Sequence, residues 1–334
     1  MIITPDGFRD RVGRREFVGL AVGAFVVASI PLSRRRPAAV VRRSVPVMGT
    51  IAQFAVVHPD QWRAHAAIDS AVDELRWVER TMTRFTATSD IGRANAGAAR
   101  DAVAVSTQTA RVATEALRWA DALDGRYDPA LGALVALWDV RNRHEPPPDE
   151  RIAPLAARSF HRAVEVGIRG GAPVLRYHDD DARLDLGSVA KGYGVDRAVD
   201  ALRRHGIEKA VVVAGGDLYA LGTATDGEPW NIGIQSPTDE DQTVGSLQLS
   251  DRAVATSGTY RQFFRHGGRT YHHLLDPVTG APRATGMQSL TIVADAVMHA
   301  DAASTALFGL PEREIMGMLA RHLPGATLAR AIGS

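Results

Sequence analysis

Asp185 and Lys191 lie within one seven-residue stretch, and their side chains could together hold a phosphate beside a metal ion. Residues 185–196 read DLGSVAKGYGVD, which predicts a strand ending in a carboxylate, a turn through glycine and the start of a helix. A helix N-terminus offers free N–H groups to an anion, and a lysine adds positive charge. Lys191 is one of only two lysines, the other being Lys209, against 37 arginines, so it is less easily read as an interchangeable surface cation. The alternative is a solvated lysine at the start of a helix.

Asp301, Ser304 and Thr305 have the spacing i, i+3 and i+4 in a predicted helix over 295–308. Residues at this spacing share one helical face, so their oxygens lie one turn apart. Carboxylate and hydroxyl oxygens are ligands that Mg²⁺ prefers. The sequence therefore predicts an oxygen-rich cation site on this helix, with a polar surface turn as the alternative.

Two adjacent histidines, His272 and His273, end a predicted strand before a proline-glycine loop at 276–280. Neighbouring side chains on a strand point to opposite faces, so at most one histidine should reach a given site. His273 is the candidate base that removes a proton from an attacking hydroxyl. The alternative is that the loop is only a turn and that His273 donates to a main-chain carbonyl.

Several established catalytic patterns are absent from the sequence. It contains no Walker A order, no Gly-x-Ser-x-Gly elbow, no His-Glu-x-x-His pair and no Gly-x-Gly-x-x-Gly turn. These absences argue against P-loop phosphate binding, acyl transfer, zinc hydrolysis and Rossmann hydride transfer.

The elements that must position these residues alternate between helices and short strands. We expect helices at 66–82, 107–123, 190–205, 295–308 and 312–322. We expect strands at 45–57, 162–168, 174–177, 182–185, 210–214, 230–235, 245–249, 253–256, 260–265, 270–274 and 288–294. The run of hairpin-like strands predicts an α+β fold of two lobes, with mixed or antiparallel sheets flanked by helices. Residues 146–148 are three prolines, so we place a possible lobe boundary near 144–150.

The first 43 residues differ in composition from the rest. They contain nine arginines against three acidic residues, so the remainder has 30 basic and 35 acidic residues and is unlikely to bind nucleic acid. Residues 13–20 read GRREFVGL, a twin-arginine pattern, and an apolar run follows over 17–31. We expect an export leader over 1–43, periplasmic location and a body over 44–334, with membrane association possible through the leader. The chain has no cysteine, which excludes disulfides and thiolate sites.

Eight motifs occur in the order typical of the ApbE family of FAD:protein FMN transferases, which the chain resembles from about residue 45 to the last helix. They are Met48-Gly49-Thr50, Thr83-Arg84-Phe85 with Ser89-Asp90-Ile91, Tyr127-Asp128-Pro129, residues 185–196, Gly215-Gly216-Asp217, residues 256–260, residues 273–280 and residues 301–305. Each motif is weak alone, but their order is specific.

The resemblance implies transfer of FMN from FAD to a threonine or serine hydroxyl of an acceptor protein, with Mg²⁺ bound and AMP leaving. It implies an FAD site lined by Met48, Phe85, Arg126, Tyr127, Asp128, Asp185, Lys191 and Leu275. It also implies a metal held by the main-chain carbonyl of Ser188 and by the side chains of Asp301 and Thr305. The acceptor motif Asp-x-x-Ser/Thr-Gly-Ala-Thr is absent from this chain, so we do not expect self-flavinylation.

Two other functions use the same residues. In the first, water replaces the acceptor hydroxyl and the protein is an FAD pyrophosphatase that releases FMN and AMP. In the second, the protein is a periplasmic FAD carrier without turnover. Omitting the acceptor distinguishes the first from a transferase, and FAD binding that is indifferent to loss of Asp301 indicates the second.

Overall fold

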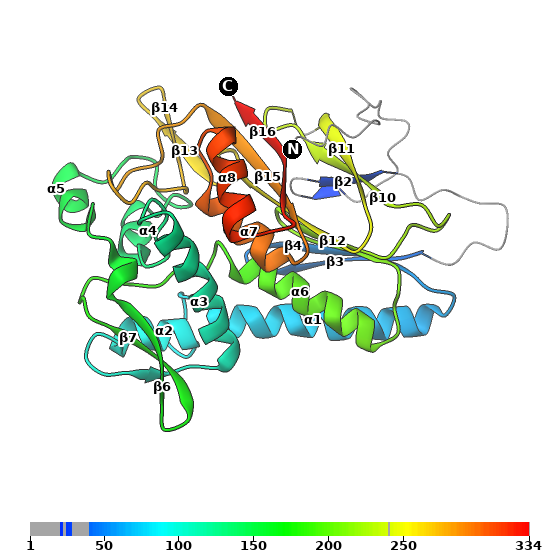
Figure 1. Ribbon diagram of the computed structural model, residues 1–334, viewed down its shortest axis with the longest axis horizontal. Coiled ribbons are helices and arrows are strands. Elements are labelled where there is room, and N and C mark those ends of the chain that lie inside the picture. The colour runs from blue at the N-terminus through cyan, green and yellow to red at the C-terminus, as the bar shows by residue number, and fades with distance from the viewer. Residues whose placement is uncertain (1–20, 23–24, 29–39, 240, 334) are drawn as a thin grey trace.

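A computed structural model describes residues 21–22, 25–28, 40–239 and 241–333. Figure 1 shows a large sheet with long helices at one end of the molecule and a group of shorter helices at the other. The helices are α1 (Gln61–Met82), α2 (Asp90–Gly97), α3 (Thr107–Ala122), α4 (Gly132–Trp138), α5 (Asp149–Ile152), α6 (Ala190–Arg204), α7 (Val297–Ala306) and α8 (Glu312–His322). Short 3-10 helices span Ala153–Leu155 and Phe160–Ala163.

A seven-stranded sheet forms the centre of the fold, and every neighbouring pair of its strands is antiparallel. In spatial order its strands are β16 (Thr327–Gly333), β15 (Met287–Ala294), β12 (Arg252–Gly258), β9 (Asp217–Leu221), β8 (Ala210–Ala214), β4 (Thr50–Val57) and β3 (Val40–Val47). Both faces of β8 are buried, which suits its run of three valines. The predicted α+β class with antiparallel sheets is confirmed.

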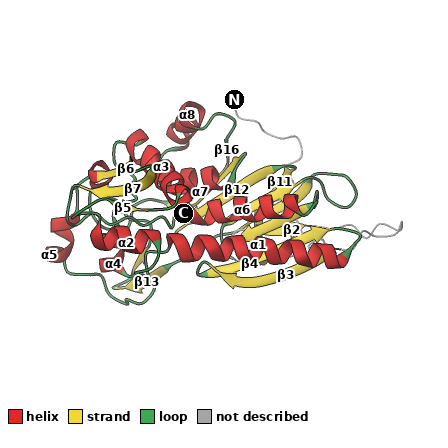
Figure 2. Ribbon diagram, turned by 90° about the horizontal axis from the view of Figure 1, so that it is seen from below, coloured by secondary structure: helices red, strands yellow, loops and turns green. Residues whose placement is uncertain are grey.

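Helices α1, α6 and α7 cover one face of this sheet, and α1 and α6 lie side by side (Figures 1 and 2). Ile68 and Leu75 of α1 are fully buried and pack in one core with Leu202 of α6 and Phe54 of β4. Asp60 caps α1 by accepting from the N–H of Arg63 over 3.1 Å. This packing holds α6 beside α1 over the sheet.

A smaller antiparallel sheet covers the opposite face. Its strands are β1 (Ala21–Val22), β2 (Phe25–Ala28), β10 (Trp230–Gln235) and β11 (Thr243–Leu249). Trp230 packs against Val211 and Leu218 of the large sheet. Strands β1 and β2 belong to the apolar run that we predicted as part of a leader, and β2 pairs with β10. The twin-arginine residues 13–20 lie outside the described residues.

The short helices enclose a second core at the other end of the molecule. Trp119, Trp138 and Phe160 are buried there. A three-stranded sheet flanks this core and consists of β5 (Val103–Ala104), β7 (Ala172–Tyr177) and β6 (Val164–Arg169). A separate hairpin is formed by β13 (Phe263–His266) and β14 (Arg269–His272). In the described part of the chain, no helix has the length and apolarity needed to cross a bilayer.

Several predicted elements differ from the structure. The strand expected at 45–57 is the hairpin of β3 and β4, because Met48 and Gly49 both adopt left-handed backbone angles, with φ of 54° and 66°, and form its turn. Residues 182–185 were expected as a strand but form an extended connection with one isolated bridge, between Leu131 and Arg183. The prediction missed several short elements, among them α2, β9 and β16. The mixed patterns of α2 and β16 resemble loops, whereas β9 is a short apolar strand that is buried throughout.

Candidate functional site

Lys191 lies in the first turn of α6, where that helix crosses α7. The crossing is close because residue 192 is glycine: a Cβ there would lie 2.5 Å from the carbonyl oxygen of Val297 and 2.9 Å from the Cβ of Asp301. The main-chain N–H of Gly192 therefore reaches Asp301 and donates to its Oδ2 over 3.0 Å. One free N–H group of this helix N-terminus thus binds a carboxylate of the protein itself.

Lys191 joins two buried carboxylates. Its Nζ lies 2.8 Å from Oδ2 of Asp217 and 3.2 and 3.3 Å from the two side-chain oxygens of Asp301. Asp217 and Asp301 are only 1% and 3% exposed. Burial alone would lower the pKa of Lys191, but the two negative charges raise it above its usual value, so the lysine remains protonated.

The nearby negative charge and the burial of Asp301 make its ionised form less favourable. Burial in the first place, and the neighbouring charge of Asp217 in the second, raise the pKa of Asp301 from 3.8 to about 8. Lys191 and the N–H of Gly192 act in the opposite direction without offsetting this rise. When both carboxylates are ionised, they share one ammonium and leave an excess negative charge, which suits the centre to a further cation.

Hydroxyl groups extend the centre along α7. Thr305 lies one turn beyond Asp301, as the sequence predicted. Ser257, near the end of β12, places its Oγ 3.0 Å from Oγ1 of Thr305 and 2.9 Å from Oγ of Ser304. Ser304 in turn donates to the main-chain carbonyl of Asp301 over 3.1 Å. The end of β12 and the inner face of α7 therefore form one hydroxyl-rich surface.

Ser188 reaches the same region through Tyr127. The two hydroxyl oxygens are 2.6 Å apart. Burial, and then the charges of Asp301, Asp128 and Asp185, raise the pKa of Tyr127, whereas its bond to Ser188 acts in the opposite direction. Tyr127 is thus a neutral hydroxyl within electrostatic reach of Asp301.

The donor set fits a hard divalent cation. Asp301 would supply one carboxylate, Thr305 one hydroxyl and Ser188 one main-chain carbonyl. Mg²⁺ usually completes its coordination with water and substrate phosphates. Among the described residues, no group of three or more histidine, cysteine or acidic side chains could hold a metal ion. A cation here would therefore depend on Ser188 and Thr305 as well as on Asp301.

His273 is a neutral base beside this centre. Burial in the first place, together with the nearby positive charges of Lys191 and Arg141, lowers the pKa of His273 from 6.5 to about 4. Its Nδ1 and its main-chain nitrogen lie 3.3 and 3.2 Å from the carbonyl oxygen of Gln262. Because a carbonyl only accepts, Nδ1 carries the proton and Nε2 is left as the acceptor.

His272 has a structural role instead. Its Nε2 lies 3.2 Å from the carbonyl oxygen of Arg283, and its Nδ1 accepts from the N–H of Leu274 over 3.3 Å. The structure thus directs the two adjacent histidines to different partners, as expected for neighbouring strand positions.

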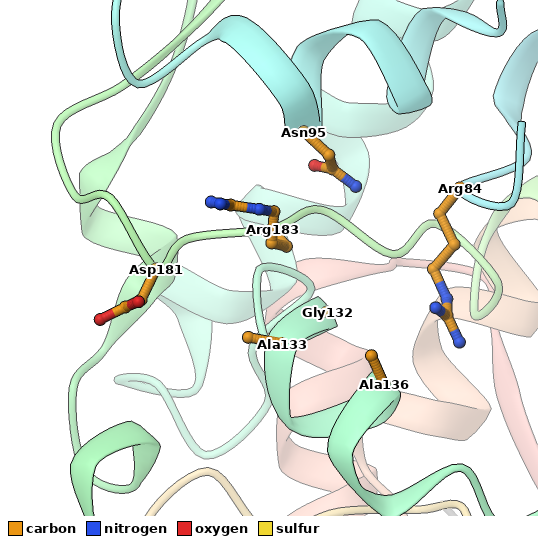
Figure 3. A pocket seen from close by; sticks show the side chains of 7 residues that line it. All are labelled: Arg84, Asn95, Gly132, Ala133, Ala136, Asp181 and Arg183. Carbon is orange, nitrogen blue, oxygen red and sulfur yellow. The ribbon is translucent and has the colours of Figure 1, made fainter. Parts of the chain in front are cut away.

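Arg84 links two residues that the resemblance places in the flavin site. Its guanidinium lies 4.2 Å above the centre of the Phe85 ring, and its Nε donates to Oδ2 of Asp185 over 2.8 Å. Phe85 is 74% exposed, so its ring is available for stacking. Figure 3 shows Arg84 at one side of a cleft of about 320 Å³, which is also lined by Asn95, Gly132, Ala133, Ala136, Asp181 and Arg183.

Met48 occupies the hairpin turn between β3 and β4 and packs on α6. A Cβ at position 194 would lie 3.1 Å from its Sδ, so Gly194 makes room for this contact. A left-handed conformation is uncommon for a residue other than glycine, asparagine or aspartate. The turn therefore places Met48 on the helix that carries Lys191.

The side chains of three other predicted residues make contacts within the protein. Arg126 directs its side chain away to Glu314 of α8, over 2.6 Å. Asp128 is buried, and its side chain accepts from the main-chain N–H groups of Ala130 and His161 over 2.8 and 3.0 Å. Leu275 is buried too. Asp128 and Leu275 thus shape the loops around Tyr127 and His273.

Asp217 and Ser257 belong to the centre, although the sequence reasoning assigned them no role. Both lie in motifs that the resemblance rests on. The sequence did offer a signal for Asp217, because it directly follows an apolar strand and two glycines that form a tight turn. Nothing in the sequence around Ser257 indicates that it faces Thr305, because that contact joins residues 48 positions apart.

The α+β fold thus encloses two carboxylates, an ammonium and a row of hydroxyls where α6 crosses α7, and a neutral imidazole lies within electrostatic range of that ammonium. Residues 48–328 match the model of the ApbE family, and the chain belongs to that family. The resemblance seen in the sequence is thereby confirmed.

The chain is similar to two curated proteins named FAD:protein FMN transferase. The protein from Vibrio cholerae serotype O1 is 32% identical over 288 residues, covering 85% of each chain. The protein from Treponema pallidum is 32% identical over 297 residues, covering 85% of this chain and 82% of its own.

Two solved structures share the fold. The flavin transferase ApbE from Vibrio cholerae superposes with a TM-score of 0.74 at 30% identity, covering 89% of this chain and 98% of that one. The ApbE protein from Thermotoga maritima gives a TM-score of 0.76 at 27% identity, covering 89% and 97%.

Proposed function

We propose that this protein transfers the FMN moiety of FAD to a threonine or serine hydroxyl of an acceptor protein, with Mg²⁺ bound and AMP released. The names of its relatives from Vibrio cholerae and Treponema pallidum support the reaction class. The observation that carries the proposal is the contact between Lys191 and Asp301, with the neutral His273 within electrostatic range of Lys191, in the part of the chain that matches the family.

The residues that would hold the metal are Asp301 and Thr305 through their side chains and Ser188 through its carbonyl. Bound Mg²⁺ would supply positive charge at the pyrophosphate of FAD. Lys191 keeps Asp217 and Asp301 in place, because its ammonium lies between both carboxylates. Gly192 orients Asp301 from the other side through its N–H.

The acceptor hydroxyl must lose a proton as it attacks. Its oxygen forms a bond to the phosphorus on the FMN side, and the bond from that phosphorus to the bridging oxygen breaks, so that AMP leaves with the bridging oxygen and its electron pair. Nε2 of His273 receives the hydroxyl proton, since Nδ1 is occupied by the carbonyl of Gln262. This assignment leaves Asp301 to the metal.

The flavin would lie along Met48, Phe85 and Asp185. Phe85 offers an exposed ring for stacking. Arg84 contacts that ring with its guanidinium and donates a hydrogen bond to Asp185. Phe85 lacks a hydroxyl, so its contact with the flavin is limited to stacking and apolar contact.

The decisive experiment combines the full chain with FAD, Mg²⁺ and an acceptor protein that carries the threonine motif. We expect flavin that remains on the acceptor after denaturation, together with one AMP per flavin. Release of FMN and AMP at the same rate without acceptor would instead indicate a pyrophosphatase. Tight FAD binding with no product under any condition would indicate a carrier.

We further propose that residues 1–43 direct export and that the reaction takes place on the periplasmic side of the cytoplasmic membrane. The twin-arginine pattern at 13–20 motivates this proposal. Fusing residues 1–43 to a reporter that is active only after export provides the test. We expect activity that is lost when Arg14 and Arg15 are both replaced by lysine; a reporter that is exported equally well with the two lysines would contradict it.

A further inference from the structure

In the described part of the chain, Arg261 has no carboxylate partner. It lies beyond the end of β12, and its Cζ is 5.5 Å from the centre of the Tyr260 ring. Its Nε and Nη2 are buried, and neither has a hydrogen-bond partner among the described residues; the same is true of the Tyr260 hydroxyl. Leaving buried donors unsatisfied is unfavourable, above all on a charged group. A bound anion would relieve this cost.

The position of Arg261 connects it to the centre on two sides. A Cβ on Gly216 would lie 3.8 Å from its Nη2, and Gly216 directly precedes Asp217, the partner of Lys191. On the other side, the next residue is Gln262, whose carbonyl fixes His273. Arg261 therefore lies close to residues that adjoin the lysine–carboxylate group on one side and the neutral base on the other.

The other cations of the site already have acceptors. Lys191 lies between two carboxylates, and Arg84 and Arg126 each bind a carboxylate of the protein. Arg141 donates to the side-chain oxygen of Gln262 over 3.1 Å and is exposed. The pyrophosphate of a dinucleotide brings two negative charges, and a cation held by Asp301 is partly neutralised by that carboxylate. Among these cations, Arg261 is the one with buried N–H groups that have no acceptor in the described residues, and a pyrophosphate could supply that acceptor. Its planar guanidinium can donate two parallel hydrogen bonds to phosphate oxygens.

We propose that Arg261 is a binding site for the pyrophosphate of FAD, held in orientation by the ring of Tyr260. This inference rests on the proposed function. When the phosphorus–oxygen bond breaks, the electron pair moves onto the bridging oxygen that leaves with AMP, and the N–H groups of Arg261 donate to the phosphate on which that charge develops.

The test compares Arg261→Met with Arg265→Met in the full chain. Arg265 is a matched control, because it also lies over an aromatic ring, that of Phe263 at 5.7 Å, but is exposed on β13. Binding of FAD, riboflavin and inorganic pyrophosphate is measured by calorimetry with Mg²⁺ chelated, and thermal unfolding is followed with and without FAD. We expect Arg261→Met to weaken FAD and pyrophosphate binding at least tenfold and to leave riboflavin binding unchanged. Arg265→Met should behave like the unmodified protein.

Stability separates a binding role from a structural one. Without ligand, Arg261→Met should unfold at the same or a higher temperature, because it removes unsatisfied buried donors, and its rise in Tm with FAD should shrink. A lower Tm with an unchanged FAD-induced rise would overturn the inference, and so would unchanged FAD affinity. Arg261→Lys should recover part of the affinity, because it keeps the charge without the paired N–H groups.

The controls also distinguish this inference from the proposed function. If the unmodified protein binds pyrophosphate through Arg261 but neither binds FAD nor transfers its FMN, the proposed function fails and an anion site remains. If it transfers FMN from FAD and Arg261→Met does so with the same FAD affinity, only the inference fails. If it binds neither FAD nor pyrophosphate, both are refuted.

Discussion

Replacing Asp301 with asparagine should stabilise the metal-free protein while abolishing flavin transfer. The change preserves the shape of the side chain and leaves an oxygen for the N–H of Gly192, but it removes one of two buried negative charges that share Lys191. Activity and stability should therefore change in opposite directions, which is typical of a charge retained for a ligand.

The magnitude follows from the raised pKa of Asp301. Between 3.8, its usual value, and about 8 in the folded protein, the native state binds a proton that the unfolded state has released. The stability of the unmodified protein should therefore fall as pH rises through this window. One pKa unit corresponds to about 1.4 kcal/mol, so the full shift sets an upper limit of about 6 kcal/mol at pH 8 and above. We expect Asp301→Asn to gain at least about 2 kcal/mol at pH 8.5 and nothing at pH 4.

Urea unfolding with EDTA at pH 4, 7 and 8.5 measures this gain. Asp121→Asn is the control, because the Asp121 side chain is 74% exposed. Adding Mg²⁺ at pH 8.5 should raise the midpoint for the unmodified protein but not for Asp301→Asn. Asp301→Asn could instead be less stable than the unmodified protein at pH 8.5. The attraction of Asp301 to Lys191 would then outweigh its burial and its repulsion from Asp217, and the argument that the site needs a further cation would fail.

Three further changes test other parts of the site. His273→Ala should reduce transfer on the order of 10²-fold or more with little change in FAD affinity; because the pKa of His273 is lowered to about 4, the acid limb of kcat/KM should lie near pH 4, and a limb near 6.5 would refute the assignment. Gly192→Ala should cost about 1–3 kcal/mol of unfolding free energy and most of the activity, since its Cβ would meet the carbonyl of Val297 at 2.5 Å, and a variant with normal Tm and activity would contradict this. Arg84→Met should weaken FAD binding about tenfold without lowering Tm, because it frees Asp185; unchanged affinity in a fluorescence titration would place the flavin elsewhere.

Periodic segments were predictable because their patterns are local. The spacing of Ile68 and Leu75 indicated α1, and the run of three valines indicated β8. Residues 312–322 were predicted as a helix, with the bounds that the structure shows. The predicted element boundaries were wrong where backbone conformation decides them. The left-handed φ angle of Met48, for example, turns one expected strand into a hairpin.

The sequence by itself determined the local parts of the site: the turn at Gly187 ahead of Lys191, the spacing of Asp301 and Thr305 on one helical turn, and the order of motifs that marks the family. These features depend on neighbours along the chain, so residue types and spacing suffice to reveal them. Only the tertiary structure decided that Lys191 binds Asp217 and Asp301, and that two buried nitrogens of Arg261 have no acceptor among the residues described. Those relations arise where strands and helices distant in sequence pack together, and the burial that shifts the pKa of Asp301 exists only after that packing.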